Sequence, residues 1–516
     1  MRLAFDNAFR RDLPGDPETG RHTRQVSGAL WSEVQPSPVP APRLLALSPE
    51  VAAAIGFSRE DTASSRFAEV FAGNALIDGM QPIATNYGGH QFGHWAGQLG
   101  DGRAISLGEV IGADGRRHEL QLKGAGPTPY SRRADGRAVL RSSLREFICS
   151  EAMQALGVPT TRALSLVATG EAVVRDILYA GDPKPEPGAI VCRVSPSFLR
   201  FGHFELPASR GEHALLRQLW AFMCARDFPE FEGAADRDAQ VFRAICERTA
   251  LLIAQWMRVG FVHGVMNTDN LSVLGLTIDY GPYGWLEDFD PAWTPNTTDA
   301  EGRRYAFGRQ PQIAHWNLSC LAGALSSLFE DQEPLREGLR AYAETFNRTH
   351  AGLNAGKLGL LDPRDEDTVL SQRLYGLMHA AELDFTLTFR ALMDFDAAAP
   401  EVDLLRAASY DEAAFQAQRP ALAAWLADYA QRLHGEAAPA ARRERTAALN
   451  PLYVPRNWLA QQAIDAAEQG DLAPLHRLQA VLERPYDAQA GAESYAQKRP
   501  EWARHRAGCS MLSCSS

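Results

Sequence analysis

The sequence has little of three features that would assign its class at once: long apolar runs, an excess of positive charge, and a cysteine framework. No apolar run approaches the roughly 18 residues that span a bilayer, and residues 1–6 lack the apolar core of a secretory signal. Asp and Glu (63) outnumber Lys and Arg (52), a net charge of −11, whereas nucleic-acid binding needs clustered positive charge. Seven scattered cysteines form no disulfide framework. These absences predict a cytoplasmic protein with no membrane and no nucleic acid among its partners.

The local composition of the sequence changes along its 516 residues. Residues 1–80 are mixed and include a proline-rich connector, so we expect an N-terminal extension there. Residues 81–205 are rich in glycine and in the short alternating runs typical of strands. Amphipathic segments predict helices from about 206 to 485, and residues 486–516 form a polar tail. A strand-rich part followed by a helix-rich part predicts an α+β fold of two lobes with a site between them.

One helix is well marked within the strand-rich part. Glu146 follows Ser143 by three residues, the spacing of a capping box, and apolar residues then recur at helical intervals until Gly157. Beyond the helix, two short strands, 163–167 and 172–174, flank a Thr-Gly-Glu segment. We therefore expect the helix to begin at Ser143 and a hairpin-like turn between the two strands.

A glycine-rich segment, residues 88–108, precedes a strand that ends at Lys123. Glycines let backbone N–H groups approach phosphates, but the segment contains neither a Walker loop nor a good dinucleotide fingerprint. Lys123 at a strand end and Glu146 on the next helix resemble the lysine–glutamate pair that serves ATP phosphates in protein kinases. Three alternatives stay open at this point: a flexible turn, a solvated lysine, and a glutamate that only caps its helix.

His90 and His94 are four residues apart, a spacing that zinc enzymes use on helices. Gln91 stands where a zinc hydrolase has its glutamate base, and Gly93 disfavours a helix. Hydrogen bonding within the fold is therefore the preferred interpretation of this pair.

The segment with the richest chemistry, residues 261–281, follows an apolar-periodic helix. Asn270 and Asp279 offer hard oxygen ligands on adjacent turns, as Mg²⁺ requires, and they match the two metal-binding positions of the kinase pattern. In that pattern, however, Val265 occupies the position of the catalytic aspartate, and valine accepts no proton. Asp269 is the nearest carboxylate, and it is either a base that acts from a different place or a turn-forming residue.

Arg193 and Arg200 flank a short loop. Guanidinium groups clamp phosphate oxygens in bidentate fashion, so two arginines that point inward would add positive charge for a triphosphate. The alternative is a pair of surface arginines.

Five motifs closely resemble the selenoprotein O (SelO) family, and the resemblance covers essentially the whole chain: NYGGHQFGHWAGQLGDGR, ELQLKGAGPTPYSR, LREFICSEAM, HGVMNTDN and IDYGPYG. The resemblance implies a protein-kinase-like fold and an adenylyltransferase that moves AMP from ATP to Ser, Thr or Tyr hydroxyls of proteins. It further implies that ATP lies flipped relative to a kinase, with its α-phosphate facing the acceptor, and that Mg²⁺, or Mn²⁺, is the metal.

Carried over by motif, the resemblance implies a role for each candidate residue. Asp269 would be the proton acceptor, and Lys123 would hold the phosphates with support from Glu146. Asn270 and Asp279 would bind the metal. The remaining residues would contact the nucleotide: Gly100, Gly102, Arg103, Asp135, Gly136, Arg193 and Arg200.

The tail carries two cysteines. In the family, selenocysteine or cysteine precedes a terminal Ser-Ser, and here it is Cys514, with Cys509 five residues earlier. Exposed tail thiols can be redox-active, and the alternative is that both are inert. Because residues 293–296 contain no cysteine, we expect no disulfide between that segment and the tail.

Two other functions stay open. One is an atypical protein kinase, which the valine at position 265 argues against. The other is a non-catalytic, nucleotide-binding module of the pseudokinase type.

Overall fold

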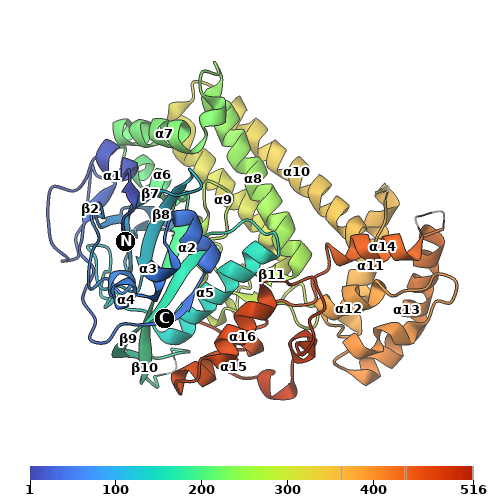
Figure 1. Cartoon of the computed structure of the whole chain (residues 1–516). Helices are drawn as coiled ribbons and strands as arrows, with labels where there is room; N and C mark the ends of the chain where they lie inside the picture. Colours follow the sequence, from blue (N-terminus) through green and yellow to red (C-terminus); the bar gives the residue numbers. More distant parts are fainter. Residues whose placement is uncertain (180, 362, 435, 437, 514–516) are drawn as a thin grey trace.

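The computed structural model describes residues 1–179, 181–361, 363–434, 436 and 438–513. Its central feature is an eight-stranded antiparallel sheet, drawn in blue and green on the left of Figure 1. The strand order is β2-β4-β7-β8-β10-β9-β3, and β1 pairs with β7. Residues 1–80 therefore contribute strands to the same sheet. The strands are β1 (Ala4–Phe5), β2 (Trp31–Glu33), β3 (Arg43–Leu47), β4 (Ile83–Thr85), β7 (Ala104–Ile111), β8 (Arg117–Lys123), β9 (Arg162–Arg175) and β10 (Lys184–Ser195).

The register of β8 and β10 places two cations on one face of this sheet. Lys123 is directly opposite Val191, and Gln121 is opposite Arg193. Directly paired residues, and residues two apart on one strand, share a face. Lys123 and Arg193 therefore leave the sheet on the same side, as neighbours.

The predicted hairpin turn around Gly170 is wrong. Strand β9 continues through this region to Arg175 and pairs antiparallel with β10, which begins at Lys184. Gly170 has a left-handed φ of 77°, and the register shifts locally, so this glycine marks an irregularity within a long strand. A glycine that bends a strand and one that reverses the chain look alike in sequence.

The predicted capping box is also wrong. Helix α5 runs from Leu140 to Ala155, and its N-cap residue, Val139, makes no side-chain capping bond. Ser143 lies inside the helix and donates its hydroxyl to the carbonyl of Ala189 at 3.2 Å. The helix is buried along most of its length, so tertiary packing rather than a cap determines where it begins.

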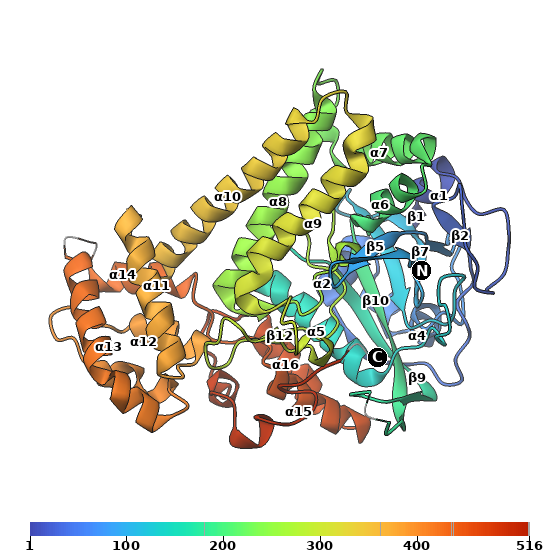
Figure 2. The same ribbon diagram turned by 180° about the vertical axis from the view of Figure 1, so that it is seen from behind.

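Long helices follow the sheet in sequence. Helices α8 (Arg237–Val259) and α10 (Glu333–Lys357) run side by side, with α9 (Gln310–Leu325) next to them, as Figures 1 and 2 both show. Helix α8 ends at Gly260, which has a left-handed φ of 78° and donates its N–H to the carbonyl of Trp256. This turn leads into β11 (Phe261–Val262), which pairs with β12 (Gly284–Trp285). The segment between β11 and β12 contains Asn270 and Asp279.

The other helices surround these two parts. A group of helices lies far from the sheet in Figure 1: α11 (Asp365–Ala380), α12 (Phe385–Leu392), α13 (Glu412–Arg432) and α14 (Pro439–Ala447). Helices α15 (Asn457–Glu468) and α16 (Ala473–Leu482) pack on α5. The remaining helices are α1 (Ala8–Asp12), α2 (Pro49–Ile55), α3 (Arg59–Ala63), α4 (Ser65–Phe71), α6 (Gly202–Ser209) and α7 (His213–Asp227). Among the residues that the structure describes, no helix is both long and apolar enough to cross a membrane.

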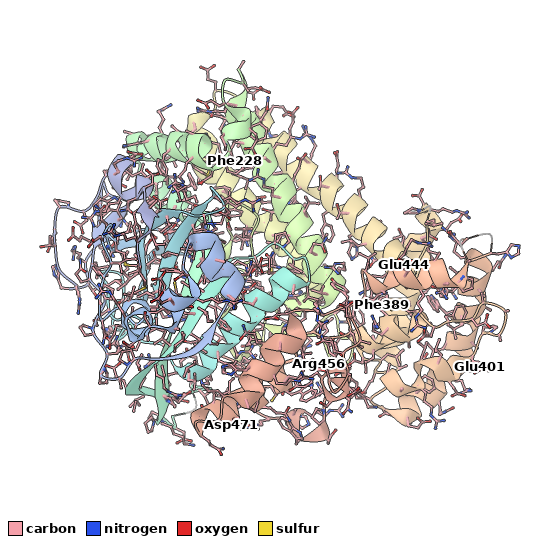
Figure 3. All side chains as sticks on the ribbon, in the orientation of Figure 1. Phe228, Phe389, Glu401, Glu444, Arg456 and Asp471 are labelled. Carbon is pink, nitrogen blue, oxygen red and sulfur yellow. The ribbon has the colours of Figure 1, made fainter. Side chains whose placement is uncertain are left out.

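A buried ion cluster connects the distant helical group to the rest of the molecule. Arg456, labelled in Figure 3 between α16 and that group, contacts Glu287 closely and bonds both carboxylate oxygens of Asp384 at 2.8 and 2.9 Å. All three side chains are buried. Burial raises the pKa of Glu287 to about 7, although Arg456 acts in the opposite direction.

Replacing Arg456 tests this cluster. In Arg456→Met the two carboxylates stay buried without their counter-charge, so we expect the free energy of unfolding to fall by about 3–5 kcal/mol. The control is Arg419→Met, which breaks the exposed pair between Arg419 and Asp403 and should cost about 0–1 kcal/mol. Urea denaturation measures both values. Equal losses in the two variants would contradict a structural role for the buried cluster.

Candidate active site

A cavity of about 980 Å³ lies between the sheet and the segment that joins β11 to β12. Such a volume is at the upper end of ordinary ligand sites. The residues predicted from the sequence meet at this cavity, and only Glu146 and Arg200 of that set do not line it. The lining members are Gly100, Gly102, Arg103, Lys123, Asp135, Gly136, Arg193, Asp269, Asn270 and Asp279.

Asp279 is the centre of the charge network. Its carboxylate makes close contacts with Arg193 through one oxygen and with Arg200 through the other, and Lys123 Nζ lies 3.7 Å away. Burial alone would raise the pKa of Asp279, but these three cations outweigh it and hold the pKa well below its usual value. Its backbone has a left-handed φ of 55°, an unusual conformation for a residue other than glycine. The network therefore contains a carboxylate that is ionised at neutral pH.

Glu146 lies behind this network. Lys123 Nζ is 2.6 Å from Glu146 Oε2, and Arg193 Nη1 is 3.3 Å from the other carboxylate oxygen. Burial lowers the pKa of Lys123, and the charges of Glu146 and Asp279 oppose that effect. The lysine is thus a buried, paired cation and not a solvated surface charge, and Glu146 holds it instead of capping its helix.

Arg200 is buried beneath the cavity. Its Nη1 donates to the backbone carbonyl of Asp269 at 3.0 Å, and its guanidinium lies over the ring of Tyr87, 4.8 Å from the centroid. Arg193 and Arg200 therefore both point inward, and neither is a surface arginine.

Asp269 is in a different environment from Asp279. Gln91 Nε2 donates to its Oδ2 at 3.2 Å, while its Oδ1 is buried and has no hydrogen-bond partner among the described residues. Burial raises the pKa of Asp269 to about 7, and the charge of Arg200 reduces that shift. A carboxylate of this kind can gain and lose a proton near neutral pH.

Asn270 closes the 3₁₀ turn Thr268–Asn270. Its Nδ2 donates to the carbonyl of Val265 at 2.9 Å, which leaves the side-chain carbonyl oxygen available as a ligand. His263 stacks on Trp256 and bonds the carbonyl of residue 278 at 2.9 Å, and burial lowers its pKa. His263 therefore holds the backbone just before Asp279 in place.

Two glycines of the cavity are required by close packing. A Cβ on Gly136 would lie 2.2 Å from the backbone of Gly126, and one on Gly100 would lie 2.4 Å from the ring of Tyr130. Both glycines have φ near 70°. Asp135, next to Gly136, pairs with Arg175 at 2.7 Å on the rim of the cavity.

Sequence reasoning missed most of the basic lining. Six further arginines line the cavity: Arg132, Arg133, Arg137, Arg141, Arg145 and Arg175. A signal was available in two places, because two adjacent arginines follow the GAGPTPYS segment and two others lie four residues apart before Glu146. Together with Arg103, Lys123 and Arg193, these arginines make the cavity strongly basic, although the net charge of the chain is −11.

The C-terminal tail reaches the same cavity. Leu512 and Ser513 line it, and Leu512 exchanges backbone hydrogen bonds of 2.9 and 2.8 Å with Pro295 and Thr297. Cys509 is buried, which raises its pKa to about 11, and of the two alternatives for the tail thiols this favours an inert cysteine at position 509. Cys514 lies outside the described residues.

Comparison with known proteins establishes the class of this enzyme. Proteins named protein nucleotidyltransferase YdiU from Xanthomonas campestris pv. campestris (strain 8004) and Azoarcus sp. (strain BH72) are 64% and 62% identical over 516 residues, 100% of this chain and 99% of each relative. One from Xanthomonas oryzae pv. oryzae (strain MAFF 311018) is 61% identical over 517 residues, 100% of both chains. The chain is thus an enzyme of the protein nucleotidyltransferase class.

Within that class the chain belongs to the SelO family. The family described as protein adenylyltransferase SelO matches residues 20–483. The resemblance drawn from the sequence motifs is confirmed.

The packing of Gly89 against Asp269 can be tested by one methyl group. A Cβ on Gly89 would lie 2.6 Å from Asp269 Oδ1, so Gly89→Ala should lower the free energy of unfolding by about 1–3 kcal/mol. The control is Gly302→Ala, where nothing lies within 4 Å of the added atom and a change within about 0.5 kcal/mol is expected. Urea denaturation compares the two. If Gly89→Ala is as stable as the control, the backbone at Gly89 does not pack closely against Asp269.

Proposed function

We propose that this enzyme transfers AMP from ATP to Ser, Thr or Tyr hydroxyls of proteins and releases pyrophosphate. The observation that carries the proposal is the pair of carboxylates: Asp279 is held ionised among cations, and Asp269 has a pKa raised to about 7 by burial. Sites with two such different carboxylates are suited to one metal or charge role and one proton-transfer role. Val265 occupies the position where a kinase would have its base, so Asp269 is the carboxylate left for proton transfer.

The basic cavity supports ATP as co-substrate. Lys123, held by Glu146, and Arg193 contact the phosphates in this proposal, with Arg200 supporting them from below. The flipped pose of ATP, with its α-phosphate toward Asp269, is part of the proposal. The rest of the proposed nucleotide contacts come from Gly100, Gly102, Arg103, Asp135 and Gly136. These five residues line one cavity with Lys123 and Arg193.

Asn270 and Asp279 have the donor chemistry that a divalent metal needs. The free side-chain carbonyl of Asn270 and the carboxylate of Asp279 are hard oxygen ligands, which suit Mg²⁺ or Mn²⁺ together with phosphate oxygens. When bound, the ion supplies positive charge that stabilises the leaving phosphates. Asp279 contacts Arg193 and Arg200 in the protein alone, so ligand binding has to rearrange these contacts.

The proposed reaction moves one proton and exchanges one phosphorus–oxygen bond. Asp269 accepts the proton of the acceptor hydroxyl, whose oxygen bonds to the α-phosphorus of ATP. The bond from that phosphorus to the oxygen leading to the β-phosphate breaks, and pyrophosphate leaves. Lys123 and the arginines offset the charge that develops on the phosphates.

The architecture is proposed to be that of a bilobal protein-kinase-like fold with extensions. The proposed units are an N-terminal extension (1–80), whose strands β1, β2 and β3 join the sheet of the N-lobe, an N-lobe (81–205), a helical C-lobe (206–485) and a tail (486–516). Two observations support this division: the Lys123–Glu146 pair on a strand and the following helix, and a catalytic segment that begins after α8. Both features belong to the kinase pattern.

Labelled ATP separates this proposal from its two alternatives. With ATP labelled at the α-phosphate, acceptor proteins should become labelled, and mass spectrometry should find added AMP on hydroxyl side chains. With ATP labelled at the γ-phosphate, no label should transfer. Transfer of only the γ-label would establish an atypical kinase, and binding of ATP without any transfer would establish a non-catalytic module.

The raised pKa of Asp269 predicts a pH profile. The ionised form is the base, so kcat/KM should rise with pH through about 7 and level off above it, falling about tenfold per pH unit below. Asp269→Asn should lose about 10²–10⁴-fold in rate and should keep its affinity for ATP. The activity that remains should not change with pH near 7.

The result for Asp269→Asn is interpretable only if the variant is folded, which its circular dichroism and ATP affinity report. Gln91→Met is a matched comparison, because it removes the hydrogen bond to Oδ2 but keeps the carboxylate. It should raise the pKa of Asp269 and move the rise of kcat/KM to higher pH. Full activity of Asp269→Asn would remove this residue as the base.

A further inference from the structure

Three side chains with metal-ligand chemistry meet outside the nucleotide cavity. His90 comes from β5 (Gly88–Gln91), Glu205 from α6 and Cys320 from α9. Their ligand atoms all lie within 4.8 Å of one another, and His90 Nδ1 is 2.7 Å from Glu205 Oε1. An imidazole, a carboxylate and a thiol from three separate elements thus surround one point.

The carboxylate of Glu205 has an unused oxygen. Its side chain is only 3% exposed, and its Oε2 is buried without a hydrogen-bond partner among the described residues. A buried carboxylate oxygen without a partner is costly, and a cation would satisfy it.

The imidazole is held in place but remains accessible. The ring of His90 packs against Trp95 and Trp316, at centroid distances of 5.1 and 5.5 Å. The His90 side chain is 28% exposed, which gives an ion a route from solvent and leaves room for a water molecule. An entry path is one requirement of a metal site.

We propose that His90, Glu205 and Cys320 bind one Zn²⁺ ion, with water in the fourth position. Nitrogen, oxygen and thiolate ligands together favour Zn²⁺ over Mg²⁺, which prefers oxygen alone. Binding replaces the hydrogen bond between His90 and Glu205 with two metal bonds, and the thiol proton of Cys320 passes to solvent. This site is separate from the oxygen ligands Asn270 and Asp279.

The position of the site indicates what a bound ion would do. Strands β5 and β6 (His94–Gln98) form a hairpin, and the backbone N–H of His90 donates to Thr268 Oγ1 at 2.7 Å. The next residue, Gln91, bonds Asp269. A metal ion at His90 would therefore connect this hairpin to α6 and α9 next to Asp269. In this proposal His90 is a positioning residue.

The four-residue spacing of His90 and His94 does not define this cluster. His94 lies on the opposite strand of the hairpin, paired with Gln91, and it does not belong to the cluster. The ligands of His90 come instead from residues more than 100 positions away.

Cobalt provides a direct test in the full-length protein. After chelation, Co²⁺ is titrated without ATP and with excess Mg²⁺, which occupies oxygen-only sites. We expect about one Co²⁺ per chain with a thiolate-to-cobalt absorption band, displaced by Zn²⁺, and a higher melting temperature with Zn²⁺. Absence of the thiolate band in the wild-type protein would overturn the proposal.

Two variants identify the ligands, and a third is the control. Cys320→Ser should lose the thiolate-to-cobalt band, and Glu205→Gln should keep a weaker band. Both variants should bind Zn²⁺ at least about tenfold more weakly, because even residues that only hydrogen-bond to metal ligands change metal affinity by about 10–100-fold. Cys509→Ser removes a thiol elsewhere and should bind as the wild type does. Unchanged Zn²⁺ affinity in Cys320→Ser would overturn the proposal, and if that variant does not fold, the Glu205→Gln affinity decides. None of these readouts depends on AMP transfer, so the two proposals fail independently.

Discussion

The structure around the cavity depends on one half-buried carboxylate, that of Asp279. Arg193 and Arg200 are desolvated cations, and such charges are stable in a fold only when they are paired. Asp279 contacts both and lies 3.7 Å from Lys123, so one side chain ties β8, β10 and the segment between β11 and β12 together. Lys123, Arg193 and Arg200, which pair with Asp279 in the protein alone, are also cations suited to phosphate oxygens.

The contrast between Asp269 and Asp279 follows from what each carboxylate faces. Asp279 faces three cations, which outweigh the effect of burial and lower its pKa. Asp269 is more deeply buried, but Arg200 hydrogen-bonds its backbone carbonyl rather than its carboxylate. Burial therefore dominates and raises the pKa of Asp269 to about 7. A difference in hydrogen-bond geometry thus shifts the pKa values of two acidic residues ten positions apart in opposite directions.

The surroundings of the site come from distant parts of the chain. The hairpin of β5 and β6 covers Asp269, the tail borders the cavity at Leu512 and Ser513, and α15 and α16 pack on α5, which carries Glu146. Each of these segments packs beside the site without belonging to the charge network. The zinc ion proposed at His90 would add a connection between the hairpin and helices α6 and α9.

The sequence by itself determined the family, the mixed content of strands and helices, and ten of the residues that line the cavity, because these reside in local motifs. It also showed that Val265 cannot act as a base. It did not determine that Gly170 lies within a long strand, that α5 begins before Ser143, or that His90 meets Glu205 and Cys320 and not His94. Only the tertiary structure decided these points and the pKa of Asp269, because burial, register and pairing of charges arise from contacts between residues far apart in the chain.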